Sequence, residues 1–466
     1  MNLVRVLARL TGLAAFVAFL PLAGAAAGGG KSFSISEAVE YALGHNPRVR
    51  EVEAAKSVAK ERIDVARAGL LPDLSISAQL NRATGNVVPG SIFYMPGIPN
   101  VSGPPRGRTF DGGVFGSAVG ASASWDVLLL ARQMAVVDSA LAEEGRTEAA
   151  MDALRLDVAF NAADRFLTAL SRGEVVRAAR AGVDRDRVFV QIVKVLVDQT
   201  LRPGVDLSRA QAELSIAEAQ LVRSEQSEAV ARIELAQSLG EPKLDVSPLP
   251  GPLLSVQPGA APGATRPHPA IVESDAAVAA AQKRQQAVSL EYLPRIALVG
   301  ALWTRGSGLP DLNKASPADG LVPDTPNWAA GVRFAWPLLE TIGARARARA
   351  EGANVQVVSA RRASLGTLID AQLLEAASIA DGARRVASET PVAVAAARAA
   401  ETQATARYKA GLATVLEVAE AQRLLTDAEI QDAEARLGVW SGLLLAARAA
   451  GDLGPFLALA SGTGGR

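Results

Sequence analysis

The fold of this chain is decided by residues 131–199, which read ARQMAVVDSALAEEGRTEAAMDALRLDVAFNAADRFLTALSRGEVVRAARAGVDRDRVFVQIVKVLVDQ. No proline occurs between Pro105 and Pro203, and the stretch holds only three glycines, at positions 145, 173 and 182. Because proline breaks helices and alanine favours them, this composition predicts one continuous helix of roughly 100 Å at about 1.5 Å per residue. Charged residues interrupt the stretch too often for a lipid-spanning helix, so its length predicts an extended helical assembly in water.

The bulk composition excludes several classes of function. The 466 residues include 48 basic and 48 acidic side chains, so a net charge of zero provides no electrostatic footprint for nucleic acid. Cysteine is absent, which removes thiolate chemistry and disulfides. His45 and His268 are the only imidazoles, and neither has a second ligand at a spacing that suits a metal. We therefore expect no catalytic, cofactor-binding or metal site, and no enzymatic activity.

The first residues have the order of a secretory signal peptide. Arg5 and Arg9 precede an apolar run from Leu10 to Leu22, and small residues follow at positions 23–27. The apolar run is shorter than the roughly 18 residues that a membrane span needs, which disfavours the alternative of a short anchor. We expect residues 1–27 to be removed and the mature chain to lie outside the cytoplasm.

The chain contains two copies of one structural unit. The pair His268-Pro269 follows Asn46-Pro47 by 222 positions, and Ala421-Gln422 follows Ala210-Gln211 by 211 positions. Each copy predicts helix, strand, strand, long helix and helix in this order. We expect a first repeat at 34–240 with its long helix at 131–199, a Pro- and Gly-rich linker at 241–268, a second repeat at 269–452 with its long helix at 343–409, and a flexible tail at 453–466. Pro391 predicts a kink or short break in the second long helix.

Four segments are expected as strands, at about 72–82, 115–127, 295–305 and 327–336. Apolar and polar residues alternate clearly in the first of these and poorly in the third. Four strands cannot close a membrane barrel, and in lipid every strand edge must be paired. Closure therefore demands several chains, and a trimer would supply twelve strands, above the minimum of about eight in membrane barrels.

Several short motifs resemble those of a known channel family. Ser36-Glu37-Ala38-Val39 precedes Asn46-Pro47, Leu70-Leu71-Pro72 precedes a strand, and Arg407-Tyr408-Lys409-Ala410-Gly411 precedes Ala421-Gln422 and Glu434-Ala435-Arg436-Leu437. In this order and doubled spacing, the chain from about Ser34 to Asp452 resembles the TolC-type outer-membrane efflux and secretion channels. The resemblance implies an α+β membrane protein whose duplicated helix-strand-strand-helix-helix unit forms, as a homotrimer, a 12-stranded outer-membrane β-barrel continued by a long periplasmic α-helical barrel.

The resemblance also implies a function and partners. A member of this family is a passive exit duct in the cell outer membrane, serving a tripartite efflux pump or a type I secretion system. It docks to a periplasmic adaptor protein and is energised by an inner-membrane pump of the RND or ABC type. The alternative is a secreted trimeric coiled-coil scaffold or adhesin without a pore, against which the alternating strands and the duplicated layout argue.

The resemblance places a periplasmic gate at the tips of two helix hairpins, around Thr200, Gly204 and Gly411. Asp206 and Tyr408 match family positions that tie neighbouring hairpins shut. The arginine that completes this link in the family is Ala413 here, so another contact is needed. Thr200 stands where the second repeat has Gly411, which makes the first tip less typical.

Two carboxylates and three tryptophans complete the expected functional residues. Glu417 and Glu420 match acidic positions that ring the family's constriction. Because residues three apart share a helix face, they would place two carboxylates per chain around a pore and favour cations; a solvated helix face is the equal alternative. Trp125, Trp328 and Trp336 suit an interfacial aromatic belt, with ordinary barrel packing as the alternative.

Overall fold

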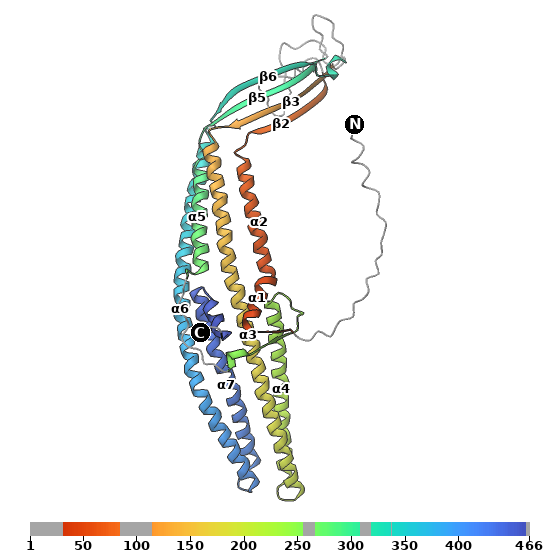
Figure 1. Ribbon diagram of the computed structural model, residues 1–466, viewed down its shortest axis with the longest axis vertical. Coiled ribbons are helices and arrows are strands. Elements are labelled where there is room, and N and C mark those ends of the chain that lie inside the picture. Colours follow the sequence, from red (N-terminus) through yellow and green to blue (C-terminus); the bar gives the residue numbers. More distant parts are fainter. Residues whose placement is uncertain (1–30, 84–113, 255–265, 308–317, 337, 463–466) are drawn as a thin grey trace.

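The computed structural model describes residues 31–83, 114–254, 266–307, 318–336 and 338–462. In these residues the molecule is long and narrow, with a sheet at one end and two helix-hairpin tips at the other (Figure 1). The expected signal peptide, residues 1–27, lies outside the described ranges. Within them, none of the helices carries the length of apolar sequence that a bilayer crossing requires.

The first repeat begins with two capped helices. Ser34 caps the first helix through a reciprocal pair of contacts with Glu37, and Asn46 caps the second, whose first residue is Pro47. Proline suits this first position because the helix has no acceptor for its missing N–H. The elements are β1 (Lys31–Phe33), α1 (Ile35–His45), α2 (Pro47–Ala68), β2 (Asp73–Ala83), β3 (Val114–Asp126), α3 (Leu130–Asp198) and α4 (Gly204–Ser238).

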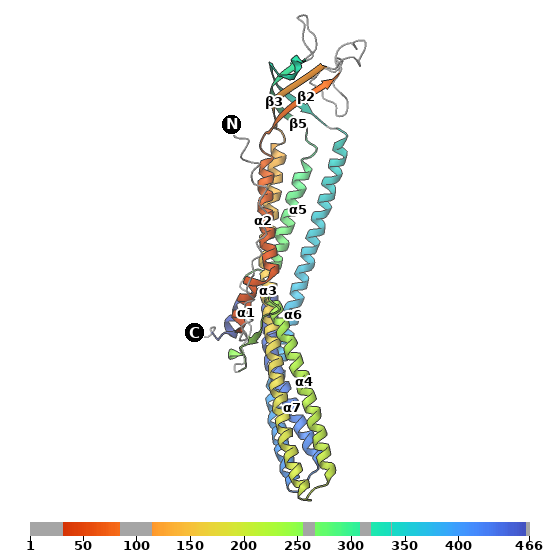
Figure 2. The same cartoon turned by 90° about the vertical axis from the view of Figure 1, so that its right-hand side faces the viewer.

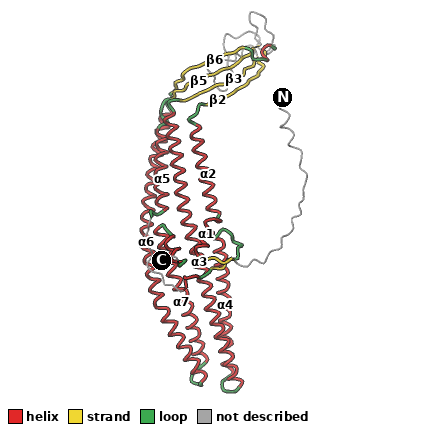
Figure 3. Tube along the Cα trace, in the orientation of Figure 1, coloured by secondary structure: helices red, strands yellow, loops and turns green. Residues whose placement is uncertain are grey.

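The second repeat follows the same plan. Its elements are α5 (Pro269–Ser289), β5 (Arg295–Ser307), the short helix η2 (Asp319–Leu321), β6 (Thr325–Ala335), α6 (Glu340–Lys409) and α7 (Val415–Ala450). Of the kink or short break expected at Pro391, the break does not occur: α6 is one unbroken helix (Figure 3), and Pro391 lies inside it. A proline removes one backbone hydrogen bond, and the neighbouring Thr390 hydroxyl donates to Asp432 on α7 at 2.8 Å, which braces α6 there.

Two short helices in each repeat lie end to end along one long helix. α2 and α4 pack along α3, and α5 and α7 pack along α6 (Figure 2). Each junction has a glycine in the left-handed region, Gly240 with φ +92° after α4 and Gly451 with φ +82° after α7. A Cβ at Gly240 would lie 2.8 Å from the His45 carbonyl oxygen, and one at Gly451 would lie 2.8 Å from the His268 Cα. Only glycine allows α4 to end this close to the start of α2, and α7 to end this close to the start of α5.

A mid-height core surrounds these junctions, and it includes segments that the sequence predicted to be linker and tail. The indole N–H of Trp440 donates to the Leu253 carbonyl at 2.9 Å, and its ring meets Phe456 edge-on with the centroids 6.2 Å apart. Leu253 lies in η1 (Gly251–Leu254), preceded by β4 (Val246–Pro248), which pairs in parallel with β1. Phe456 lies in α8 (Gly454–Ala460). The flexible tail expected at 453–466 therefore contains a packed helix, because Trp440 offers a surface on which Phe456 is buried.

The four long strands form one antiparallel sheet in the order β2-β3-β5-β6. The pairs Ile76↔Ala121, Ala121↔Leu302 and Leu302↔Trp328 place apolar side chains of all four strands on one face. No other part of the described chain covers that face, since the exposed fractions of Ile76, Leu302 and Trp328 are 82%, 68% and 75%. The opposite face carries polar pairs such as Ser75 and Ser122, whose hydroxyl oxygens are 2.8 Å apart. Alternation along β2, β3 and β6 thus gives the sheet one apolar face and one more polar face.

Candidate functional site

Two helix hairpins, α3–α4 and α6–α7, end at the pole of the molecule that is farthest from the sheet (Figures 1 and 2). A residue with left-handed backbone follows the end of α3 and of α6: Thr200 with φ 60° and Gly411 with φ 82°. The N–H of the next residue, Leu201 or Leu412, then donates to the carbonyl five positions back, at 2.9 and 2.8 Å. Thr200 therefore adopts the glycine geometry at a strain of about 1 kcal/mol. Gly204, the third predicted tip residue, is the first residue of α4.

Tyr408 is the centre of the contact between the two hairpins. Its side chain is fully buried, and its ring meets that of Phe189 on α3 edge-on at 5.3 Å. Its hydroxyl donates to the Asp206 carboxylate at 3.4 Å, so the structure brings together the two residues that were expected to link the hairpins. Burial, followed by the nearby Asp206 charge, raises the pKa of Tyr408, which keeps the hydroxyl protonated as a donor. The surrounding apolar cluster comprises Phe189, Val190, Val193, Ala210, Tyr408, Ala413, Val415 and Val418.

Arg202 completes this contact, and sequence reasoning missed it. Its Nη2 donates to the carbonyl oxygens of Tyr408 and Ala413 at 2.7 and 3.2 Å, and its guanidinium carbon lies 4.4 Å from the centre of the Tyr408 ring. One side chain from the first repeat thus holds the backbone of the second. The repeat offset contained the signal, because Ala413 minus 211 positions is Arg202. The arginine that was expected at position 413, in the second repeat, therefore stands at the equivalent position of the first repeat, as Arg202.

The two predicted gate carboxylates lie on the first turns of α7 and differ in their contacts. Glu417 accepts from the N–H and the hydroxyl of Thr414 at 3.1 and 3.2 Å, which closes a capping box at the start of the helix. Within the described residues Glu420 makes no ion pair or hydrogen bond, and both side chains are exposed. Glu417 therefore has a structural role beside any role at a pore, whereas Glu420 is free to face a pore.

The three tryptophans are not equivalent. Trp125 on β3 donates from its indole N–H to the Leu70 carbonyl at 3.1 Å, just after the end of α2. Trp328 lies on the apolar face of β6, and Trp336 follows the end of that strand with half its side chain exposed. Trp125 thus ties the sheet to a helix, and the interfacial belt stays a prediction. Among the described residues, no group of His, Asp and Glu side chains is arranged to hold a metal ion.

The sequence and the fold were compared with those of known proteins. The model of the outer membrane efflux protein family matches residues 38–241, which is nearly all of the first repeat. The outer membrane protein VceC from Vibrio cholerae has a similar structure, with a TM-score of 0.70 at 18% identity, over 90% of this chain and 96% of that one. No curated protein sequence gives a significant match.

Two further solved structures extend this comparison. A membrane protein from Pseudomonas aeruginosa has a TM-score of 0.74 at 18% identity, over 90% of this chain and 92% of that one. The MtrE outer membrane channel from Neisseria gonorrhoeae, solved in its open state, has a TM-score of 0.70 at 18% identity, over 90% and 89%. These likenesses confirm the expected α+β fold for a single chain. The family model thus matches the first repeat, and the likeness to the solved structures extends the same fold over both repeats.

Proposed function

We propose that this protein is a passive exit duct of the cell outer membrane, which works as a homotrimer in a tripartite efflux pump or a type I secretion system. A periplasmic adaptor protein and an inner-membrane pump of the RND or ABC type would dock to its helical end and supply the energy. The observation that carries this proposal is the continuous apolar face of the four-stranded sheet.

The sheet is built for lipid on one side and water on the other. Ile76, Leu302 and Trp328 lie on an apolar face that no other part of the described chain covers. An uncovered apolar surface of this extent is typical of a membrane or protein contact rather than of a surface in water. The outer strands β2 and β6 each have one edge without a partner in the described residues. Lipid requires these edges to be paired, which three copies forming twelve strands would achieve.

The hairpin tips are the proposed site of closure. The cluster of Arg202, Tyr408 and Asp206 ties the two hairpins of one chain together at the end where the helical cylinder would narrow. Glu417 and Glu420 lie exposed on α7 beside this cluster, where carboxylates from three chains would favour cations. The tips are thus proposed as a gate and not as a catalytic site.

The decisive experiment is reconstitution of the full chain in planar lipid bilayers, together with its mass in detergent by light scattering. We expect trimers that conduct ions. A pair of variants tests the role of the sheet: Trp328→Arg puts a charge on the apolar face, at a cost of up to about 2–4 kcal/mol in lipid, and should reduce insertion. Asn327→Arg puts the same charge on the opposite face and should insert normally. Monomers, or trimers that never conduct, would favour the pore-free scaffold instead.

A further inference from the structure

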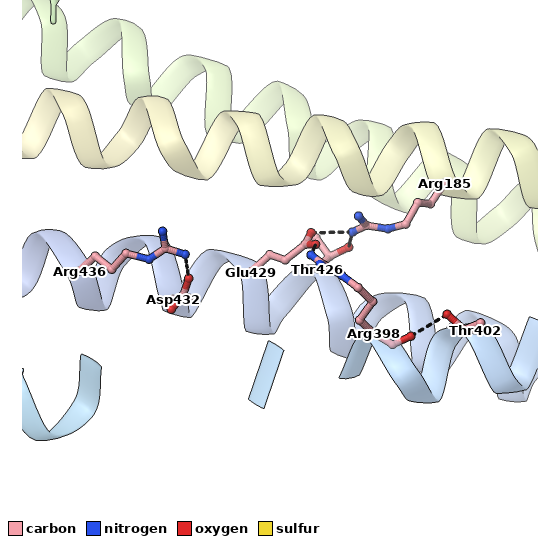
Figure 4. A network of polar contacts seen from close by, with 7 residues as sticks. All are labelled: Arg185, Arg398, Thr402, Thr426, Glu429, Asp432 and Arg436. Carbon is pink, nitrogen blue, oxygen red and sulfur yellow. Dashed lines mark hydrogen bonds and ion pairs between the residues drawn. The ribbon is translucent and has the colours of Figure 1, made fainter. Parts of the chain in front are cut away.

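The helices α6 and α7 are braced against each other by a buried carboxylate. Asp432 on α7 accepts from the Thr390 hydroxyl of α6 at 2.8 Å. It also pairs with Arg436, one turn further along α7 (Figure 4). Asp432 is almost fully buried, so it would lose much of its stabilisation if α6 moved away. This brace makes the second hairpin one body at this height.

Glu429, one turn before Asp432, has a carboxylate that is shared between the two repeats. Its Oε2 accepts from Nη2 of Arg185 on α3 at 3.0 Å, and its Oε1 accepts from Nη2 of Arg398 on α6 at 3.3 Å (Figure 4). The side chains of Glu429 and Arg185 are 18% and 24% exposed, whereas that of Arg398 is 66% exposed. Solvent screens the Arg398 contact more strongly, so the contact between the repeats is the stronger of the two.

The two repeats approach very closely beside this ion pair. Gly182 lies one turn before Arg185 on α3, and a Cβ there would come within 2.7 Å of the Thr426 hydroxyl oxygen on α7. Arg185 also donates to that hydroxyl at 2.9 Å, using the same Nη2 as for Glu429. Its Nε is buried and has no hydrogen-bond partner in the described part of the chain. A contact through one nitrogen lacks the two parallel bonds of a bidentate pair and is the easier to break.

From this arrangement we propose that Arg185 and Glu429 are positioning residues, which form a releasable latch between the repeats with Arg398 as the partner that Glu429 keeps after release. The latch lies 15 residues beyond Thr414, or about 22 Å from the tip of the second hairpin at ~1.5 Å per residue. The proposal rests on the proposed function, because the latch would hold the hairpins in the position that closes the duct.

Release of this latch leaves no buried charge without a partner. When the braced hairpin α6–α7 shifts away from α3, Glu429 keeps its contact with Arg398, and Arg185 turns toward solvent at the edge of the contact. Breaking a buried ion pair is costly mainly when one charge stays buried and unpaired. A carboxylate with one partner on each body avoids that cost, so the two repeats can separate here without unfolding.

The test compares three variants of the full-length protein, read by hydrogen exchange of the amides at 190–201 and 404–414 and by single-channel conductance. Arg185→Ala removes the contact between the repeats, and we expect about tenfold faster exchange at both tips and a higher open fraction, from a loss of ~1.4 kcal/mol. Arg398→Ala leaves Arg185 as the only arginine that pairs with Glu429 in the described residues, so exchange at the tips should be unchanged or slower. Arg187→Ala is the matched control, because this arginine of α3 pairs with Glu218 within the first hairpin; it should stay within twofold of the unmodified protein.

A latch differs from an ordinary ion pair in that Arg185→Ala accelerates exchange and Arg398→Ala does not. If both variants accelerate exchange, or if Arg187→Ala matches Arg185→Ala, the latch is refuted. Arg185→Lys, which keeps one charged donor, should restore slow exchange at least in part, and failure to do so also counts against the latch. The exchange rates decide the latch even if the unmodified protein does not conduct, an outcome that would overturn the proposed function alone.

Discussion

Replacing Arg202 by alanine should loosen the two hairpin tips. The side chain makes two charge-assisted hydrogen bonds to carbonyl oxygens of the second hairpin, at 2.7 and 3.2 Å, and covers the Tyr408 ring. Such bonds contribute about 1.5–3 kcal/mol each when buried. Arg202 is only half-buried, and the Tyr408 carbonyl still accepts from the Gly411 N–H at 3.0 Å, so its loss leaves that acceptor satisfied. We therefore expect a total near ~2 kcal/mol, equivalent to about a 30-fold change in the population of separated tips.

The assay is single-channel recording of the purified protein in planar bilayers, where separated tips should appear as a larger open fraction. The exposed Arg209 on α4 lies outside this cluster, and Arg209→Ala is the control for loss of one positive charge near the tip. The double variant Arg202→Ala with Ala413→Arg returns the arginine to the equivalent position in the second repeat, and should restore closure in part. If Arg202→Ala and Arg209→Ala give the same open fraction, the contacts of Arg202 do not hold the tips.

Three further predictions concern pH, a helix junction and the two tip carboxylates. Burial raises the pKa of Asp186 from 3.8 to about 6. As the pH rises from 4 past 6, this carboxyl group therefore destabilises the fold by about 1 kcal/mol after solvent screening. Asp186→Asn should flatten that part of the pH profile of the melting temperature. An unchanged profile would contradict the assignment. Gly240→Ala should lower the melting temperature, because a Cβ strains the left-handed backbone and collides with the next helix, whereas Gly145→Ala, inside α3 with open space around it, should not. Glu417→Ala should cost about 1 kcal/mol of folding stability because it removes the helix cap, and Glu420→Ala should cost almost nothing. Both variants should reduce the cation selectivity of the channel. An unchanged reversal potential would show that the two carboxylates are not part of the gate.

The repeated layout was readable from the sequence because its signals are local. The long proline-free stretch at 131–199 predicted the first long helix, and the offsets of 222 and 211 positions between the copies extended the prediction to the second long helix and its strands. The segment 295–305 alternates poorly because the central strand β5 has Val299 and Trp303 on the face opposite Leu298 and Leu302. Apolar residues on both faces hide the period of two, and only the position of the segment in the second copy marked it as a strand.

The contacts that join distant segments were not readable in the same way. Arg202 lies 206 positions from Tyr408, and nothing near it in the sequence indicates which carbonyls it binds. The helix α8 was expected as tail because glycines and a proline surround it, and Phe456 gains from folding only where Trp440 is already in place. The break expected at Pro391 does not form, and the neighbouring Thr390 is held by the Asp432 carboxylate of another helix. Each of these outcomes depends on tertiary packing, which overrides local propensity.

The junction glycines also make the length of this molecule modular. Gly240 and Gly451 end α4 and α7 at the mid-height core, so the helices below the core form a separate segment from α2 and α5 above it. Adding one heptad to each of the four helices below the core would rotate the contact faces by only about 20° and extend the tips by ~10.5 Å. The sheet and the core would be unaffected by such a change. The distance from the core to the tips can thus change while the part that holds the sheet stays constant.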